Sequence, residues 1–389
     1  YTGGTSDATV SITVDPVNDD PVAIDDSYSA NEDSPVVVVA PGLLSNDYDI
    51  DNAPTSNVGL TVHTVDLTGT KGNVLFAANG SFSYDPNGQF ESLDDGEQAT
   101  DTFVYTVTDG AGGFDSATVT MTIDGVNDAP TALDDSLSTD EDVDLSITVA
   151  DLLLNDSDID GDSLTVTSFT QPNHGTLIDN ADGTWTYSPN KDYTGADSFT
   201  YTVDDGSGNT RDATVNITVD PVNDEPVLAV PGDQSVDEDT VLNFPAITIT
   251  DVDAASGELQ VNLSVSQGTL TLGDTTGLSF SQGDGDQDAA LTFTGTLDDL
   301  NAALTTLSYQ GNQDFNGADQ LSVQVDDQGN TGRGTNLVDS ETVNITVDPV
   351  NDEPVLTVPG DQSVDEDTVL NFPAITITDV DAASGELQV

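Results

Sequence analysis

Val126-Asn127-Asp128-Ala129-Pro130 is one of four copies of a short phrase that recurs along the chain. The other copies occupy residues 17–21, 222–226 and 350–354, and each follows a strand-like run that ends in aspartate. The copies are separated by about 100 residues, the usual size of one domain. Repetition at this interval predicts a tandem array. Each phrase, together with the aspartate two residues before it, is called a joint, and the four are numbered in chain order.

The composition excludes several classes of protein. The chain has 389 residues with 72 acidic and 4 basic side chains, a formal net charge of −68. Binding to nucleic acid or to an acidic membrane surface requires clustered Lys and Arg, so neither is a predicted partner. There is no cysteine, which excludes disulfides and thiolate metal sites. The sequence contains no apolar run long enough to span a membrane.

Hydrophobic residues alternate with polar residues along many short runs. Ala8–Val14 alternates in this way, and the pattern recurs in Ala117–Ile123, Ala213–Val219 and Thr342–Val347, each directly before a joint. Period-2 alternation is typical of half-buried strands, and clusters of Gly, Asn, Asp and Pro separate the runs. Many short strands in units of this size predict an all-β chain of tandem β-sandwiches in an elongated array.

The joints divide the chain into five predicted parts. Complete sandwich repeats are expected at residues 19–126, 127–222 and 223–350, the last of them longer because of an insert. Residues 1–18 are expected to be the C-terminal strand of a truncated preceding repeat, and residues 351–389 the N-terminal part of a truncated further repeat. The pattern is already in progress at both ends, so we expect a segment of a longer protein without a visible signal peptide.

One stretch of the third repeat departs from strand patterns. Thr296 can cap a helix, Asp298 and Asp299 suit a helix N-terminus, and Leu297, Leu300 and Leu304 fall on one face. The stretch predicts one short helix that crosses between two sheets.

The last part of the chain is a near-copy of an earlier part. Residues 342–389 repeat residues 214–261 with a single difference, Thr357 in place of Ala229. Such a duplication is typical of an array that grows by copying.

Catalytic chemistry has little support. His63 and His174 are the only histidines, and no turn that would present a nucleophile is visible. The chain is therefore predicted not to be an enzyme. The alternating aromatic residues 185, 187, 199 and 201 are predicted core positions, with a sugar-binding platform as the alternative.

Acidic clusters recur in register with the joints. About 13 residues after each joint comes Asn-Glu-Asp or Asp-Glu-Asp, then an Asp-x-Asp motif, and in the complete repeats an acidic turn before the last strand. Two like charges about 4 Å apart repel by roughly 1 kcal/mol in water and about 4 kcal/mol near a protein surface. Ca²⁺ takes 6–8 oxygen ligands in flexible geometry, which carboxylates, amides and carbonyls supply. The clusters predict Ca²⁺ sites, and the alternative is that they are solvated turns.

These motifs resemble the calcium framework of cadherin repeats. Thr248–Asp253 is similar to the Asp-x-Asp strand end of cadherins, while residues 43–51 and 153–162 resemble bacterial cadherin-like and immunoglobulin-like tandem repeats of large surface adhesins. The resemblance covers the whole chain and implies β-sandwiches with Ca²⁺ bound at the joints. The mid-domain Asp-Arg-Glu motif of cadherins has no match, and the number of ions per joint is left open.

The resemblance also implies which residues bind the metal. The second joint would use Asp124, Asn127, Asp128, Glu141, Asp158 and Asp160, and the third Asp220, Asn223, Asp224, Glu238, Asp251 and Asp253. The corresponding residues elsewhere, together with the acidic turns, complete the candidate set: Asp15, Asn18, Asp19, Glu32, Asp49, Asp51, Asp109, Asp205, Asp327, Asp348, Asn351, Asp352, Glu366, Asp379 and Asp381.

The predicted function is a calcium-stiffened extracellular repeat segment of a bacterial adhesin, at the cell surface or secreted. Its partners would be the neighbouring repeats and a cell-surface glycan or protein receptor. The alternatives are a polysaccharide- or protein-binding module and a non-catalytic spacer of a secreted enzyme.

Overall fold

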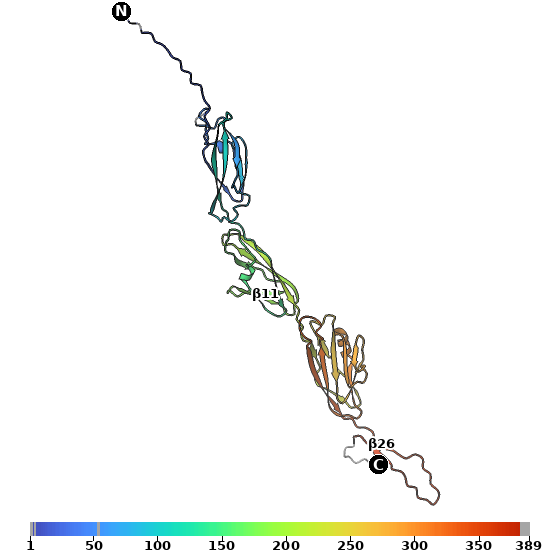
Figure 1. Ribbon diagram of the computed structural model, residues 1–389. Coiled ribbons are helices and arrows are strands. Elements are labelled where there is room, and N and C mark those ends of the chain that lie inside the picture. The colour runs from blue at the N-terminus through green and yellow to red at the C-terminus, as the bar shows by residue number, and fades with distance from the viewer. Residues whose placement is uncertain (1–2, 4, 53–54, 382–389) are drawn as a thin grey trace. The chain divides into compact units, whose positions relative to one another are not determined.

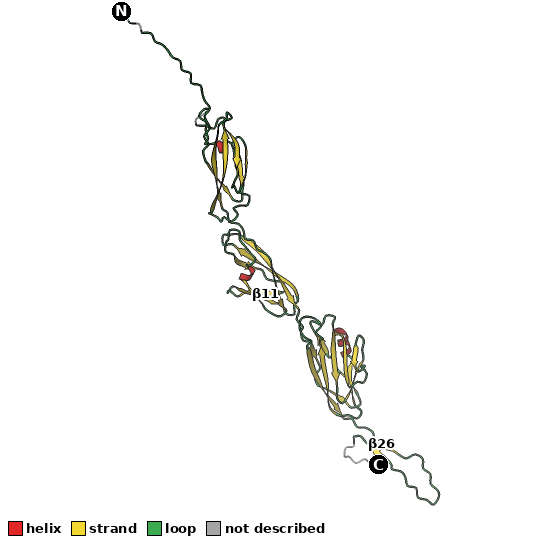
Figure 2. Cartoon of the chain, in the orientation of Figure 1, coloured by secondary structure: helices red, strands yellow, loops and turns green. Residues whose placement is uncertain are grey.

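The computed structural model describes residues 3, 5–52 and 55–381, and most of its regular structure is strand (Figure 2). The chain groups into two compact units. One comprises residues 1–137, 145–188 and 197–217, and the other comprises residues 138–144, 189–196 and 218–389. Residues 138–144 and 189–196 are part of the second repeat in the sequence, but they group with the third repeat in the structure. The sandwiches are described one by one below.

The first sandwich, drawn blue to teal in Figure 1, has two antiparallel-rich sheets. The larger sheet has the order β1 (Asp26–Asn31), β7 (Phe114–Asp124), β6 (Gln98–Thr108) and β3 (Thr61–Asp66). The smaller sheet has the order β2 (Val36–Val38), β5 (Phe82–Asp85) and β4 (Asn73–Phe76), and a 3₁₀ turn covers Gly42–Leu44.

The second sandwich repeats this plan. Its larger sheet has the order β10 (Thr165–Phe169), β13 (Gly195–Asp204), β14 (Thr210–Asp220) and β8 (Asp135–Asp140). Its smaller sheet has the order β11 (Gly175–Asp179), β12 (Thr184–Pro189) and β9 (Leu145–Thr148), and helix α1 is Val149–Leu152.

The third sandwich is larger. A six-stranded sheet has the order β16 (Gln234–Asp237), β25 (Val338–Asp348), β24 (Gly317–Asp326), β19 (Glu258–Ser264), β22 (Ala290–Thr296) and β21 (Ser279–Gln282). A three-stranded sheet has the order β17 (Val241–Asn243), β23 (Leu307–Gly311) and β20 (Gly268–Leu272). A third, two-stranded sheet pairs β15 (Val227–Ala229) with β18 (Thr248–Thr250).

The predicted helix is confirmed. Helix α2 is Leu297–Leu304, and the Thr296 hydroxyl accepts a hydrogen bond from the Asp299 amide at its N-terminus. Leu300 and Leu304 are buried, as their shared face predicts. The helix follows β22 of the large sheet and leads to β23 of the small sheet, so it is the crossover that the sequence predicts.

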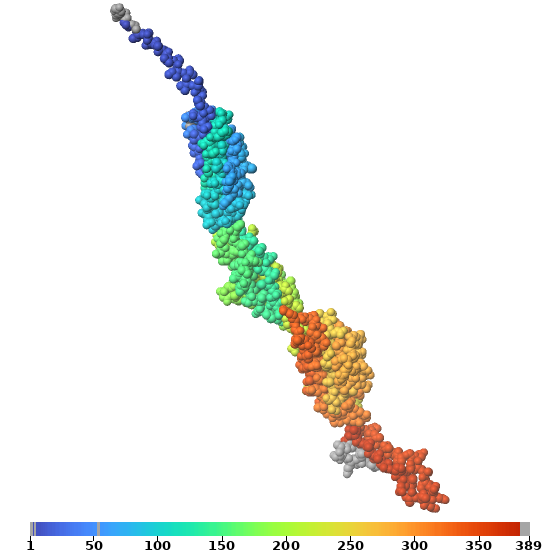
Figure 3. Space-filling model, in the orientation of Figure 1, coloured from blue at the N-terminus to red at the C-terminus, as the bar shows by residue number. Residues whose placement is uncertain are grey.

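The cores follow the alternation in the sequence. Along β6 the side chains of Phe103, Tyr105 and Val107 are buried, while the residues between them are not. Figure 3 shows the atoms on one face of these sandwiches, coloured by residue number. The all-β tandem sandwich fold is therefore confirmed.

A hydrogen-bonded tyrosine recurs in each core. The Tyr84 hydroxyl donates to Asp101 Oδ2 at 2.7 Å, and the second and third sandwiches repeat this contact as Tyr187 to Asp197 and Tyr309 to Asp319. Each aspartate also accepts from the two backbone amides of a loop, at 71–72, 173–174 and 266–267. The motif ties the small sheet to the large one, because each tyrosine comes from the small sheet and each aspartate from the large one.

Trp185 belongs to the core of the second sandwich. Its side chain is 4% exposed, and its ring packs against Phe169 and Phe199 at centroid distances of 4.7 and 5.9 Å. The alternative of a sugar-binding platform at residues 185, 187, 199 and 201 is wrong, because these rings are buried.

The strand predicted at Ala8–Val14 does not form. Val10, Ile12 and Val14 are more than 80% exposed, and residues 5–20 contain no strand (Figure 2). The same pattern forms β7, β14 and β25, each of which has a neighbouring strand on both sides. A strand needs such neighbours to be stable, and the described residues offer none to Ala8–Val14.

The further repeat predicted at 351–389 forms only one strand pair within the described residues, β26 (Val355–Thr357) with β27 (Thr376–Thr378). Figure 1 labels β26 in the red part of the chain. Residues 382–389 of this predicted repeat lie outside the described residues.

Replacing Tyr187 with Phe should destabilise the second sandwich. The change leaves the buried Asp197 carboxylate without its tyrosine donor, which should cost about 1–3 kcal/mol. Trp185 is the only tryptophan, so its fluorescence during urea unfolding of the full chain reports on this sandwich. The transition should shift to lower urea. Tyr309→Phe removes the equivalent contact from the third sandwich and should leave the Trp185 transition in place; equal shifts for both variants would contradict the assignment.

Candidate metal centres at the joints

In the first and third sandwiches, a strand near the start of the repeat leads to an acidic cluster at the next joint. β1 runs parallel to β7 with Asn31 opposite Asp124, and β16 runs parallel to β25 with Asp237 opposite Asp348. Glu32, the next residue after β1, donates from its amide to the Asp124 carbonyl at 3.2 Å. Its carboxylate accepts from the Val126 amide at 2.7 Å. Glu32 therefore lies at the second joint.

The joint assignment of the glutamates implied by the resemblance is wrong by one joint. Glu141 lies at the third joint, where its carboxylate accepts from the Val222 amide at 2.7 Å. Glu238 lies at the fourth, where it accepts from the Val350 amide at 2.6 Å. The physical reason is length: a six-residue strand covers about 20 Å, so a residue that follows it is at the opposite end of the sandwich.

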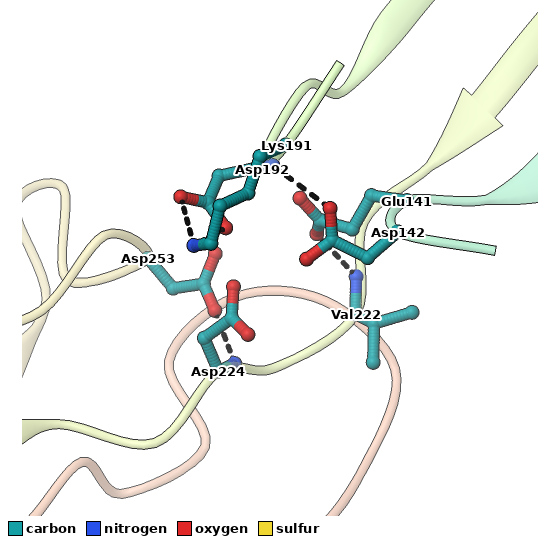
Figure 4. Close-up of polar contacts among 7 residues, drawn as sticks. All are labelled: Glu141, Asp142, Lys191, Asp192, Val222, Asp224 and Asp253. Atoms are coloured by element: carbon teal, nitrogen blue, oxygen red, sulfur yellow. Dashed lines mark hydrogen bonds and ion pairs between the residues drawn. The ribbon is translucent and has the colours of Figure 1, made fainter. Parts of the chain in front are cut away.

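Carboxylates converge at the third joint, and all of them belong to one compact unit. One oxygen each from Glu141, Asp224 and Asp253 lie within 4.8 Å of one another. Asp142 and Asp192 form a second such group with Asp224, which is shared between the two. Figure 4 shows these five carboxylates pointing toward a common space.

Backbone amides fix these carboxylates in place. The Asp224 amide donates to Asp253 Oδ2 at 2.5 Å, and the Asp192 amide donates to Asp142 Oδ1 at 3.1 Å (Figure 4). Asp142 and Asp192 both have left-handed backbone conformations, with φ of +57° and +55°. Aspartate tolerates this conformation better than most residues, which favours it in the tight turns that the site requires.

The second and fourth joints have similar groups. Asp33, Glu91 and Asp128 converge at the second joint, within the other compact unit. The fourth joint has two groups that share Asp352: Glu238, Asp352 and Asp381 in one, and Asp239, Asp314 and Asp352 in the other.

Six of these acids are absent from the predicted set: Asp33, Asp142, Asp239, Glu91, Asp192 and Asp314. The first three follow a predicted glutamate directly. The others come from a turn in the middle of the repeat, and each stands next to an aromatic residue, as in Phe90-Glu91, Asp192-Tyr193 and Asp314-Phe315. That repeated pairing is the sequence signal that could have identified them.

Several buried oxygens at the joints have no hydrogen-bond donor. Ten buried polar side-chain atoms among the described residues lack a partner, and all ten are oxygens. Eight of them belong to predicted metal ligands: Glu32, Asp49, Asn127, Asp158, Asp160, Asn223, Asp224 and Asp352. A buried oxygen without a donor costs about 1–3 kcal/mol, more when charged. A hard cation is the partner that would satisfy them, so the residues present fit Ca²⁺.

Other predicted ligands are engaged in shaping the joints. Asn127 donates to Asp205 Oδ2 at 2.9 Å, and Asn18 and Asn223 make the same contact with Asp109 and Asp327. These aspartates also accept amides from their own turns. The acidic turns therefore position the joint asparagines and leave fewer free oxygens for a metal.

The Asp-x-Asp motifs lie at the joint that precedes them, as predicted. Asp160 accepts from the Asp128 amide at 2.7 Å, and Asp51 accepts from the Asp19 amide at 2.6 Å. Asp381 accepts from Asp352 in the same way. The first aspartate of each motif bonds the amide of the second: Asp49, Asp158, Asp251 and Asp379.

The remaining predicted ligands are placed differently. The backbone carbonyls of Asp220 and Asp348 accept hydrogen bonds from the amides of Glu141 and Glu238, respectively. The Asp124 carboxylate accepts a hydrogen bond from the Gln98 side chain. The Asn351 side chain donates to the Asp352 carbonyl. Asp15 and Glu366 are exposed and lie in none of the carboxylate groups described above.

Comparison with known proteins identifies the repeats. The family model of the bacterial cadherin-like domain matches residues 18–125, and that of the cadherin-like domain matches residues 126–220. The chain is built of cadherin-like repeats. A third model, the Protein GAMETE EXPRESSED 2 domain, matches residues 243–335. None of the three descriptions names a catalytic activity.

Individual relatives are distant. The protein GAMETE EXPRESSED 2 of Arabidopsis thaliana is 30% identical in an alignment of 244 positions, which covers 59% of this chain and 25% of that protein. The solved structure of extracellular cadherin domains 3–6 of protocadherin gamma B2 is similar to this chain, at 14% identity and a TM-score of 0.43. The alignment covers 92% of this chain and 83% of the protocadherin chain. Mouse cadherin-23 domains 22–24 align with 86% of this chain and 100% of that one, at 14% identity and a TM-score of 0.41.

Cadherin-like domains are extracellular modules that generally bind Ca²⁺ and interact with neighbouring repeats or partner chains. In the part of the chain that the structure describes, no helix has the length and apolarity needed to cross a membrane.

Burial, together with the crowding of acids, raises pKa values of several carboxylates at the cadherin-like joints. Burial, and then the charges of Asp253, Asp192 and Asp142, raise the pKa of Asp224. Burial also raises the pKa of Glu141, and the charges of Asp253 and Asp224 add to this against the opposing Val222 hydrogen bond. At the second joint, burial and neighbouring acids raise the pKa of Glu91 and Asp128. These carboxylates ionise less readily in the folded protein than in the unfolded chain.

The metal-free protein should therefore lose stability as the pH rises. A raised native pKa means that the folded state binds more protons than the unfolded state above about pH 4, so unfolding becomes easier toward neutrality. Thermal unfolding of the metal-stripped full chain should show a higher midpoint at pH 5 than at pH 7. Asp224→Asn should reduce that difference and Asp7→Asn, an exposed acid outside the joints, should not. The same pH dependence in both variants would contradict this account.

Proposed function

We propose that this chain is a calcium-stiffened extracellular segment of an adhesin, of the kind found on bacterial surfaces. In this proposal residues 19–126, 127–222 and 223–350 are the repeats, and Ca²⁺ at each joint holds successive repeats in a fixed orientation. The segment acts as a spacer and takes part in cell or surface adhesion. It extends away from the cell, or is secreted, and presents a receptor-binding part to a glycan or protein.

One observation carries this proposal. Eight of the ten buried oxygens without donors belong to predicted joint ligands, and two of these residues, Asp224 and Asp352, are also members of the groups of converging carboxylates. A solvated acidic turn would expose its oxygens to water, whereas these oxygens are buried. Their burial therefore favours the metal over the alternative of solvated turns.

The sharing of Asp224 between two carboxylate groups supports more than one ion at the third joint. Glu141 and Asp253 would hold one ion with Asp224, while Asp142 and Asp192 would hold the other. The unpartnered Asn223 Oδ1 and Asp224 Oδ2 are further oxygens available to such ions. A bound Ca²⁺ supplies positive charge that converts repulsion between these carboxylates into attraction to a common point.

The third joint draws its ligands from both flanking repeats. Glu141, Asp142 and Asp192 come from the second repeat, and Asp253 from the third, while Asp224 is in the phrase that connects them. Ions bound here would link side chains of the two repeats, in addition to the covalent connection that the backbone provides.

Asp224→Asn should abolish calcium uptake at the third joint. The change removes the carboxylate common to both groups, whereas the amide left in its place supplies only one neutral oxygen. Calorimetric titration of the full chain should show saturable uptake with Kd of about 10⁻⁴–10⁻³ M. The variant should bind fewer ions, and Asp7→Asn should bind as many as the native chain. Undiminished uptake by Asp224→Asn would refute this site.

Removing calcium should shorten the protein in solution. Without ions the joints would bend more freely, so the average end-to-end distance should fall. Small-angle X-ray scattering with excess Ca²⁺ and with chelator measures this as a decrease in maximum dimension. Mg²⁺ should substitute poorly, because it requires stricter octahedral geometry. An unchanged maximum dimension after chelation would refute calcium stiffening.

A further inference from the structure

The last loop of the third repeat is longer than its counterparts. In the first and second repeats, residues 109–113 and 205–209 connect the last two strands of the large sheet. In the third repeat the same connection is residues 327–337, which is six residues longer. The longer loop contains Asn330-Thr331-Gly332-Arg333-Gly334-Thr335 and is called the clasp.

The clasp pairs with the backbone of the third joint. The Arg333 amide donates to the Pro221 carbonyl at 2.9 Å, and the Asn223 amide donates to the Arg333 carbonyl at 3.0 Å. Val222 and Arg333 thus form an isolated parallel bridge. Gly332, with φ of +85°, allows the close approach, since a Cβ there would lie 2.6 Å from the Val222 carbonyl carbon.

The Arg333 side chain faces two acids of the joint. Its Nη2 forms an ion pair with Asp140, which directly precedes Glu141 in the chain, and lies 3.4 Å from Asp220 Oδ2. These residues belong to the same compact unit. The guanidinium group remains charged at all accessible pH values, so it offers these carboxylates a permanent positive charge.

Positive charge is scarce in this protein and concentrated at the third joint. The chain has four basic residues, and Lys191 is a second one at this joint, with its Nζ 2.7 Å from Asp192. The second joint has a neutral contact at the corresponding place, where the Asn209 side chain donates to the carbonyls of Asn127 and Asp128. The two joints therefore differ in charge although they share the carboxylate groups.

We propose that the clasp is a built-in cationic restraint, with Arg333 holding the third joint in its folded arrangement when calcium is absent. The proposal rests on calcium binding only in predicting that this joint is less calcium-dependent than the second. Arg333 acts by positioning the third joint and its acids and is not itself a metal ligand. Because exposed ion pairs are weak, its charge should change the opening of the joint by only about two- to five-fold.

Hydrogen exchange of single amides in the full chain tests the clasp. In chelator and low salt, the Asn223 amide should exchange about two- to five-fold faster in Arg333→Gln than in the native protein. Asp140→Asn should act in the same direction, because it removes the partner. Arg333→Lys should restore part of the protection, and 1 M NaCl should reduce the difference by screening. Arg211→Gln, which removes the same charge from an exposed site, is the matched control.

The outcomes separate this inference from the proposed function. Equal exchange of the Asn223 amide in the native chain and Arg333→Gln in chelator, with the β24 amides still protected, would overturn the clasp. The clasp would also be overturned if the Asn223 amide exchanged at the same rate in Asp140→Asn as in the native chain. Failure of Ca²⁺ to slow the Asp128 amide at the second joint would count against calcium stiffening, while the comparison in chelator would still decide the role of Arg333.

Discussion

Repulsion between converging carboxylates is the constraint on which the joints depend. The fold gathers three acids within 4.8 Å of one another at the second joint, and two such groups at the third and fourth. Backbone amides compensate some of these charges, as Val222 does for Glu141. Compensation is incomplete, because Asp224 and Asn223 keep buried oxygens without donors. In the proposed function, cations supply the rest of the balance, either as ions from solution or as the protein's few basic side chains.

Strand direction determines which acids meet. In the first and third repeats, an early strand (β1 or β16) runs parallel to the last strand and ends beside it. The acid that follows the early strand therefore lies at the next joint and not at the joint that precedes it in the sequence. Each joint is thus assembled from residues about a whole repeat apart, as Glu141 and Asp224 show at the third joint. In this arrangement, the acids of one joint come together only when both repeats that flank it are folded.

Much of the fold could be predicted from local pattern. Alternation predicts β7 and β14, and the cap and leucine face predict α2, because the order of residues alone shows which face of an element is buried. The types of metal-ligating residue were also predictable. Their grouping is not predictable in this way: the resemblance places Glu141 at the wrong joint and does not include Asp192, because distance along the chain does not give distance across a sandwich.

The near-identical halves of the duplication separate what sequence and tertiary structure decide. The sequence by itself determined acidic joints, the alternation of strands and the local pair β15–β18, which forms again as β26–β27. Only tertiary structure decided whether neighbouring stretches become strands. Residues 234–237 form β16 against β25, while the same sequence at 362–365 forms no strand, because residues 351–381 contain no counterpart of β25. Phe244 is 6% exposed and its copy Phe372 is 65% exposed for the same reason: burial needs a partner surface that no short sequence contains.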